Sequence, residues 1–268
     1  MERPSWVPDG VDVERPSAAR VYDHYLGGLH NFAADRAMAA AAVADWPELP
    51  RIMQANRAFL RRAVRHLADQ GIDQFLDIGS GIPTVGNVHE VAQAVRPDAR
   101  VVYVDIDPVA VAHSRALLAD DPRTGVVQAD LVDVDGVLGA PATRSLLDLS
   151  RPVGLLVVAL LHFVGDERRP ADVLARYREA LAPGSHLVIS HASADGAPDR
   201  AGEHQSLYRR TATPMTMRTR DEVAGLLDGF TLVEPGLVFL PQWRPDDPSA
   251  PLTAPERFTG YAAVGRRD

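Results

Sequence analysis

A glycine-rich loop follows a short apolar run at residues 75–83, and its side chains suit the binding of a nucleotide-like ligand. The segment reads FLDIGSGIP, with Asp77 two positions before Gly79 and Gly81 two positions after it. Glycine lets the backbone turn sharply and approach a ligand closely, because no Cβ stands in the way. An acidic side chain before the loop favours a ligand with a cationic amine, such as the amino-acid portion of S-adenosylmethionine. We therefore predict that Asp77, Gly79 and Gly81 bind this ligand.

A dinucleotide is the alternative ligand for a loop of this kind. Its fingerprint is G-x-G-x-x-G, in which the third glycine packs the following helix against the strand. Here Thr84 stands at the third glycine position, and Pro83 precedes it. The loop therefore favours S-adenosylmethionine, with Thr84 and Asn87 as further candidate contacts. A nicotinamide-dependent oxidoreductase is the less favoured interpretation.

Two more acids follow apolar runs that we expect to be neighbouring strands. Asp105 ends VVYVD and precedes Ile106, and Asp130 follows VVQA and precedes Leu131. Because the carboxyl ends of parallel strands meet at one edge of a sheet, these residues are expected beside the glycine loop. We predict that Asp105 holds the ribose hydroxyls and that Asp130 accepts a hydrogen bond from the adenine amine. Leu131 would cover the base, and Ile106 is a further candidate contact; the alternative is that both acids only form turns.

His162 is the candidate general base. It follows the apolar run VGLLVVALL, so we expect it at the same edge of the sheet. A base is needed only if the methyl acceptor carries a proton, as a hydroxyl does. The alternative is a histidine that bonds to the backbone and shapes the pocket wall. His191, which follows HLVIS, is a second candidate. The histidines lack the spacing of metal ligands, so no metal site is predicted.

The segment YDHYLGGLHNFAADR is unusual for a plain structural helix. Tyr22 and Tyr25 are three positions apart and share a helix face. A glycine pair that includes Gly28 then interrupts the helix, and Asn31 follows. We predict a lid over the methionine end of the ligand, with Tyr22, Tyr25, Gly28 and Asn31 facing it. The alternative is a helical hairpin packed on the sheet, in which Asn31 caps the second helix.

Short apolar runs alternate with helical patterns from residue 72 onward, which predicts an α/β fold with a doubly wound, mostly parallel sheet. We expect an extended arm at 1–16, a helical lid at 17–71 and an S-adenosylmethionine-binding domain at 72–268. The lid would hold three helices, starting at Ser17, at about 32 and at about 51. The predicted strands are 75–78, 101–105, 125–129, 153–160, 185–190, 230–239 and 258–265. The predicted helices among them are about 87–96, 108–119, 143–149 and 170–182, and one that begins after Thr219.

The composition excludes several classes of protein. The 268 residues include no cysteine and no lysine. Disulfides, thiolate zinc sites, the P-loop lysine and Schiff-base chemistry are therefore excluded. The formal charge is -8 and no segment is densely basic, so nucleic acid is not an expected partner. We see no signal-peptide pattern and no apolar run long enough to cross a bilayer, so we expect a cytoplasmic protein without a membrane partner.

These features give the chain a resemblance to an actinomycete family of S-adenosylmethionine-dependent methyltransferase-like proteins, long treated as a domain of unknown function. The resemblance covers nearly the whole chain and implies a seven-stranded, Rossmann-like methyltransferase sheet whose last strand is antiparallel. It differs at Leu29 and His30, where many relatives carry lysine and aspartate. The stretches that carry it are PSAARVYDHYLGGLHNFAADR, FLDIGSGIPTVGNVHEVAQ, ARVVYVDIDPVAVAHSRALL, ALLHFVGDE, LAPGSHLVISHAS, EPGLVFLPQWRP and GYAAVGR.

The expected function is the transfer of a methyl group from S-adenosylmethionine, the predicted cofactor, to a small-molecule acceptor. O-methylation would follow if His162 acts as the base. An alternative from another class is a protein that binds S-adenosylmethionine or S-adenosylhomocysteine as a sensor and does no chemistry. An open acceptor cavity beside the ligand would favour the enzyme, and a plugged one would favour the sensor.

Overall fold

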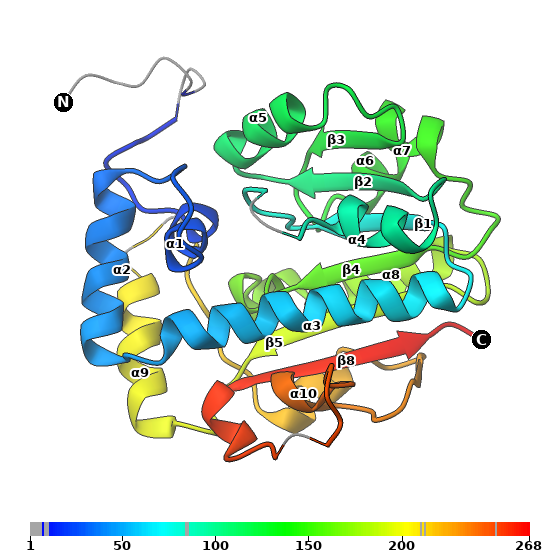
Figure 1. Ribbon diagram of the computed structural model, residues 1–268. Helices are drawn as coiled ribbons and strands as arrows, with labels where there is room; N and C mark the ends of the chain where they lie inside the picture. The colour runs from blue at the N-terminus through cyan, green and yellow to red at the C-terminus, as the bar shows by residue number, and fades with distance from the viewer. Residues whose placement is uncertain (1–6, 8–10, 84–85, 210, 212, 250) are drawn as a thin grey trace.

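One sheet with helices on both faces forms the centre of the molecule (Figure 1). The structure is a computed structural model, and it describes residues 7, 11–83, 86–209, 211, 213–249 and 251–268. Five of the strands run parallel, and β8 lies antiparallel to the last of them. The strands are β1 (Gln74–Ile78), β2 (Arg100–Asp105), β3 (Thr124–Gln128), β4 (Gly154–Val158), β5 (His186–Ala192), β6 (Thr231–Leu232), β7 (Val238–Phe239) and β8 (Gly260–Arg266).

The strand order creates a switch point in the middle of the sheet. The order is β3-β2-β1-β4-β5-β8-β6, and β7 also pairs with β8. The chain builds outward from β1 in one direction and then returns to place β4 on the other side of β1. In open α/β sheets, ligands bind in the crevice outside the carboxyl ends of strands at such a point. The loops after β1 and β4 flank this crevice.

The predicted α/β class and the mostly parallel sheet are confirmed, and the described residues form eight strands where seven were predicted. The strand predicted at 230–239 is two strands of two residues each, β6 and β7. Glu234, Pro235 and Gly236 lie between them, and a proline has no N–H to continue a ladder. The other predicted strands are confirmed within one or two residues.

Two hydrophobic clusters pack against opposite faces of the sheet. On one face the long helix α3 contributes Phe59 and Leu60, which join Phe75 of β1 in a single cluster. On the other face α8 contributes Leu174 and Tyr177, which belong to the second cluster and pack against the opposite side of the same strands. The longer helices are α1 (Ala18–Tyr25), α2 (Ala33–Asp45), α3 (Leu49–Asp69), α4 (Val88–Val95), α5 (Pro108–Leu117), α8 (Pro170–Ala180) and α9 (Pro198–Tyr208). The shorter ones are α6 (Val134–Gly139), α7 (Pro141–Leu146) and α10 (Arg220–Gly225), with 3-10 turns η1 (Leu161–Phe163), η2 (Asp166–Arg168), η3 (Leu240–Gln242) and η4 (Pro255–Phe258).

Three helices gather beyond the carboxyl ends of the parallel strands. Figure 1 shows α1, α2 and α9 at this end, while α3 runs along the face of the sheet. The helix predicted at 143–149 is instead the pair α6 and α7, which meet at Pro141. No helix was predicted at α9. The division into arm, lid and binding domain stays a prediction; of the predicted lid, α1 and α2 lie beyond the strand ends, and α3 runs from there along the face of the sheet.

Local sequence explains where several of these helices begin. The side chain of Ser17 accepts a hydrogen bond from the Arg20 N–H and caps α1, as predicted. Asp107 caps α5 by accepting from the Val109 N–H, and Pro108 occupies the first turn. Within the described residues, no helix is both long enough and apolar enough to span a membrane.

Candidate functional site

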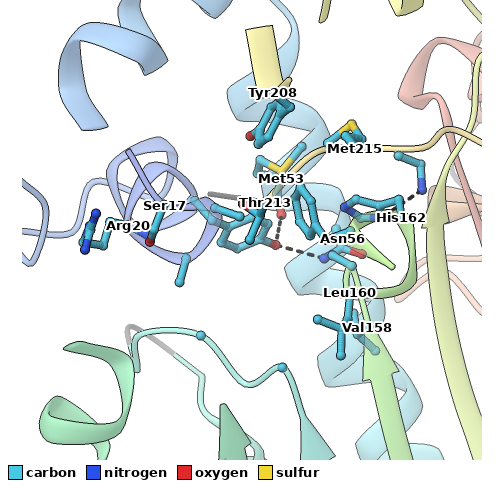
Figure 2. A pocket seen from close by; sticks show the side chains of 18 of the residues that line it. Ser17, Arg20, Met53, Asn56, Val158, Leu160, His162, Tyr208, Thr213 and Met215 are labelled. Carbon is cyan, nitrogen blue, oxygen red and sulfur yellow. Dashed lines mark hydrogen bonds between the residues drawn. The ribbon is translucent and has the colours of Figure 1, made fainter. Parts of the chain in front are cut away.

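One cavity of about 550 Å³ opens at the switch point of the sheet. Its floor is the glycine loop after β1 and the ends of β2, β4 and β5, and its roof includes residues from α1, α3 and α9. Figure 2 shows side chains from several of these elements pointing toward one another around this space. A volume in this range suits a small-molecule or cofactor site. Of the predicted residues, those that border it are Tyr22, Asp77, Gly79, Gly81, Asp105, Ile106 and His162.

The glycine loop folds back onto the end of β2, because the N–H groups of Gly79 and Ser80 donate to the Val104 carbonyl at 2.8 and 3.2 Å. The Gly79 and Gly81 residues have φ of +71° and +68°, a region that side chains rarely adopt. A Cβ at Gly79 would meet the Leu160 side chain within 3 Å, so the loop also needs glycine for packing against the end of β4. A Cβ at Gly81 would meet nothing within 4 Å, which leaves open space beside the backbone.

Asp105 is anchored so that its carboxylate faces the loop. Its Oδ2 accepts from the Gly81 N–H at 2.7 Å, and its Oδ1 accepts from the Asp107 N–H at 2.8 Å. Each carboxylate oxygen has a second lone pair, so both can still accept from ligand hydroxyls. Burial raises the pKa of Asp105 to about 6, although these backbone donors oppose the shift. The geometry therefore fits a ligand with a diol.

Asp77 is a buried acid whose carboxylate lacks a hydrogen-bond partner among the described residues. The residue is 5% exposed and lies against the cavity floor. Burial raises its pKa to about 7, and the nearby Asp105 adds to the shift, while the Arg57 guanidinium opposes it. A buried carboxylate without partners is costly, so a cationic group in the cavity would relieve the cost. This fits the amine of an amino-acid ligand.

A hydrogen-bonded chain joins α1, α3 and β5 across the roof of the cavity. Tyr22 donates from its hydroxyl to the Met53 carbonyl at 3.2 Å and accepts from Asn56 Nδ2 at 2.9 Å. Asn56 Oδ1 in turn accepts from Ser190 Oγ at 2.6 Å, and Ser190 Oγ accepts from the Ala159 N–H at 2.9 Å. Figure 2 shows Met53 and Asn56 in this arrangement. The sequence analysis named Tyr22 but missed Asn56, although a polar residue on the apolar face of α3 was a visible signal.

The N-terminal segment also contacts the floor of the cavity directly. Ser17 Oγ donates to Asp107 Oδ2 at 2.6 Å, and an Arg20 nitrogen lies 3.9 Å from the same oxygen. Arg15 donates to the Thr211 carbonyl at 2.9 Å on the opposite side. The segment before α1 is therefore hydrogen-bonded through Ser17 to the loop after β2 and through Arg15 to the segment after α9.

Three predicted lid residues are not among those that border the cavity: Tyr25 at the end of α1, and Gly28 and Asn31 in the turn between α1 and α2. Tyr25 is 7% exposed and packs in the hydrophobic core. Gly28 donates from its N–H to the Asp23 carbonyl, and any Cβ there would collide with the Asp23 carboxylate. Asn31 Nδ2 donates to Asp23 Oδ2 at 2.9 Å. The geometry of these three residues agrees with the structural alternative, since buried Asp23 organises the turn, although Phe32 rather than Asn31 is the N-cap of α2.

The remaining predicted contacts lie beside the cavity or apart from it. Asn87 caps α4, and its Oδ1 accepts from Arg57 at 3.3 Å. Asp130 forms an ion pair with Arg168 at 2.7 Å and is not among the residues that border the cavity. Leu131 is 4% exposed in the core. Thr84 lies outside the described residues. Cofactor contact at these positions stays a prediction.

His162 lies at the far end of the cavity in a cluster of rings. Its ring centroid is 4.4 Å from that of Phe163 and 5.5 Å from that of His191. Burial lowers the pKa of His162 well below its usual value, and the nearby His191, His204 and Arg218 lower it further. His162 is therefore neutral at physiological pH. His191 borders the same cavity.

Arg218 holds the segment that carries His162. It is 4% exposed, and it donates to the carbonyls of Leu161 at 2.9 Å and Val164 at 2.8 Å. It also donates to His191 Nε2 at 2.8 Å. This arginine was not found from the sequence, because nothing in the segment MRTRDE distinguishes a buried guanidinium from an exposed one.

The sheet order, the antiparallel β8 and the acid at the end of β2 together define the fold of an S-adenosylmethionine-dependent methyltransferase. A family model described as S-adenosyl methyltransferase matches residues 4–268, and the chain belongs to this family. S-adenosylmethionine is accordingly its cofactor. Among the described residues, no three His, Cys, Asp or Glu side chains gather as a metal site.

Two solved structures are similar over nearly the whole chain. A DUF574 family protein from Streptomyces avermitilis is 44% identical with a TM-score of 0.92, and the match covers 96% of this chain and 99% of that one. A Thermobifida fusca protein is also 44% identical with a TM-score of 0.92, over 99% of this chain and 100% of that one. The N-methyltransferase NodS from Bradyrhizobium japonicum, in complex with S-adenosyl-l-homocysteine, shares the fold at 16% identity and a TM-score of 0.50, over 81% and 87% of the two chains. Comparison with curated proteins gave no match.

Proposed function

We propose that this chain transfers the methyl group of S-adenosylmethionine to a small, largely apolar acceptor. The observation that carries the proposal is a continuous cavity that extends from the glycine loop to the ring cluster around His162. Among the described residues, this one cavity is bordered both by the groups that suit the cofactor and by the ring cluster. Open space on both sides supports an enzyme that also binds an acceptor over a sensor that binds the cofactor alone.

The residues at the glycine-loop end suit the parts of the cofactor. Asp105 would accept from the two ribose hydroxyls, and the open space at Gly81 would let the ligand approach the backbone. Asp77 would face the amino group, and Arg57, which lies on α3 at the same end, would face the carboxylate. The bound cofactor supplies an electrophilic methyl carbon on a sulfonium that leaves as a neutral thioether.

The residues at the other end suit an apolar acceptor. The wall there includes Met53, Phe163, Tyr208, Met215 and Met217. Methionine side chains adapt to ligands of varied shape, and aromatic rings stack on flat ones. Holding two reactants at attack distance accounts for much of the acceleration in a displacement of this kind. These residues would do so while excluding water.

The first experiment measures thermal unfolding with and without S-adenosylhomocysteine for the native protein, Asp105→Ala and the matched control Asp120→Ala. Asp120 is an exposed aspartate beyond α5. Ligand at a hundred times its dissociation constant adds about 2.7 kcal/mol to the free energy of unfolding, which raises the midpoint by several degrees. We expect this rise in the native protein and the control, and its loss in Asp105→Ala. No rise in the native protein would refute the cofactor site.

The second experiment incubates the protein with S-adenosylmethionine labelled in its methyl group and a library of small aromatic and aliphatic acceptors. Transfer of label to a library member, absent in Asp105→Ala, is the expected result. If S-adenosylhomocysteine binds but no member of the library receives the label, the sensor would be favoured.

A further inference from the structure

The two ring nitrogens of His162 have different partners. Its Nδ1 accepts a hydrogen bond from the Ala192 N–H at 3.4 Å, which Figure 2 shows as a dashed line beside the ring. A backbone N–H can only donate, so Nδ1 must carry a lone pair. In a neutral imidazole the proton then lies on Nε2. Because the pKa of His162 is lowered by burial, a second proton on Nδ1 is disfavoured.

The surroundings of His162 reinforce this tautomer. His191 Nδ1 lies 2.7 Å from the Ala192 carbonyl, so it donates, and His191 Nε2 accepts from Arg218 at 2.8 Å. Ala192 thus bonds one histidine through its N–H and the other through its carbonyl. The buried Arg218 charge and the neutral His204 also face this cluster. Among the described residues, no acid is hydrogen-bonded to the His162 ring: Asp166 accepts from Arg218, and Glu222 accepts from the Thr219 N–H.

The Nε2 side of His162 faces the cavity. The side chain is 6% exposed and borders the cavity, and within the described residues the ring forms its hydrogen bond through Nδ1 and not through Nε2. Another polar group of this wall, the buried Thr213 Oγ1, also has no hydrogen bond among the residues that the structure describes, and the Tyr208 side chain borders the same space. Burial raises the pKa of Tyr208, so its hydroxyl stays protonated and can also donate. Figure 2 shows Tyr208, Thr213, Met215 and His162 around one space.

We propose that His162 donates a hydrogen bond from Nε2–H to an oxygen of the acceptor, and that it is not the general base. The inference rests on the proposed function and names the acceptor class: a flat, mainly apolar molecule that carries a carbonyl or an ionised oxygen. A base would need a free lone pair at Nε2, and this tautomer has none. The rings of Phe163 and Tyr208, whose centroids are 5.5 Å apart, provide the apolar surface for the flat part.

An acceptor of this class can be methylated in a cavity whose wall provides no general base. The lone pair of the acceptor forms the new bond to the methyl carbon, while the carbon–sulfur bond breaks and its electron pair stays on sulfur. An acceptor atom that is already unprotonated has no proton to lose in this step. A hydrogen bond from His162 then orients the acceptor by its oxygen.

The direct test is the tautomer of His162 in the complex with S-adenosylhomocysteine. Long-range ¹H–¹⁵N correlation spectra at neutral pH distinguish a protonated Nε2 from a protonated Nδ1. The His162 signals are assigned by their absence in His162→Phe or, should that variant not fold, by their contacts with the Ala192 amide proton. We expect the proton on Nε2. A proton on Nδ1 with a bare Nε2 would overturn the inference and restore the base.

The second test compares two probes of the same shape. Acetophenone carries a carbonyl oxygen, and α-methylstyrene carries a CH₂ group in its place. We expect the native complex with S-adenosylhomocysteine to bind acetophenone about three- to tenfold more tightly, the range of one neutral hydrogen bond. His162→Phe should lose this preference, and the matched control His24→Phe, on α1 outside the cavity lining, should keep it. Equal binding of the two probes by the native complex, or an unchanged preference in His162→Phe, would refute the proposal.

These outcomes are separate from those of the proposed function. If S-adenosylhomocysteine does not bind, the cofactor site itself is wrong. If it binds and His162 has the other tautomer, only the donor role fails and the methyltransferase proposal stands.

Discussion

The buried carboxylate of Asp77 is expected to make the cofactor-free protein less stable as the pH rises. Its pKa is about 7 in the folded chain, against an ordinary value of 3.8, because burial disfavours the charged form. Between these two values the folded chain binds more protons than the unfolded chain. The free energy of unfolding therefore falls with increasing pH across this window. The penalty is absent below the ordinary pKa and complete above about pH 7.

The size of the penalty follows from the shift. One pKa unit corresponds to about 1.4 kcal/mol, so the full shift amounts to about 4 kcal/mol. This is an upper limit, because the carboxylate borders an open cavity that water can enter. Asp77→Asn removes the charge, so we expect this variant to be more stable than the native protein by up to about 4 kcal/mol at pH 8. At pH 5 the difference should be less than half as large.

Urea unfolding of the cofactor-free protein between pH 5 and pH 8 measures this difference. Asp73→Asn is the matched control, since Asp73 immediately precedes β1 but is half-exposed and pairs with Arg151. Its effect should stay within about 1 kcal/mol at every pH. The same Asp77→Asn variant should bind S-adenosylhomocysteine at least about tenfold more weakly, because a charge-assisted hydrogen bond is lost. A stability difference that does not change between pH 5 and pH 8 would refute the reasoning.

Three further substitutions test other parts of the structure. Arg218→Met should lower the free energy of unfolding by about 3–5 kcal/mol, measured in urea, because it leaves buried carbonyls without donors; a loss below about 1 kcal/mol would contradict this. Asp35→Ala should cost a similar amount of about 3–5 kcal/mol, because it leaves buried Arg20 without its 3.0 Å ion-pair partner, and the double variant Asp35→Ala/Arg20→Met should recover part of the loss. Gly79→Ala should lower stability by about 1–3 kcal/mol and weaken S-adenosylhomocysteine binding in calorimetry, because of its positive φ and the contact with Leu160; unchanged affinity would show that the loop tolerates a side chain.

The sequence was sufficient to predict the sheet and the acids at its carboxyl edge. Buried parallel strands appear as continuous apolar runs, so their ends can be located to within one or two residues. Asp105 follows such a run directly, and its position beside the glycine loop was therefore predictable. Asp130 also follows a run, but the Arg168 side chain that pairs with it comes from a distant segment. No local pattern reveals that pairing.

The roof of the cavity was harder to predict because its residues depend on tertiary packing. The helix α9 has no side-chain N-cap and contains Gly202, and its buried residues include Ala201 and His204. A helix with such a weak apolar stripe is not distinguished by periodicity. Tyr25 shares a helix face with Tyr22, as the spacing predicts, yet it packs into the core rather than facing the cavity. Helical spacing gives the face but not the neighbour that the face meets.

The contact between α2 and α9 has a consequence for how the chain folds during synthesis. The strands β1 to β3 with α4 and α5 form the cofactor half of the fold. Its elements are neighbours joined by short connections, so it can form early. The roof joins helices that are made before the sheet to one made after β5, so its contacts are non-local and form late. Until α9 emerges, apolar side chains such as Trp46 lack part of their cover, since Trp46 packs edge-on against His204 at 5.6 Å. We expect the nascent chain to acquire its cofactor half before its acceptor half, and to depend on chaperones in the interval.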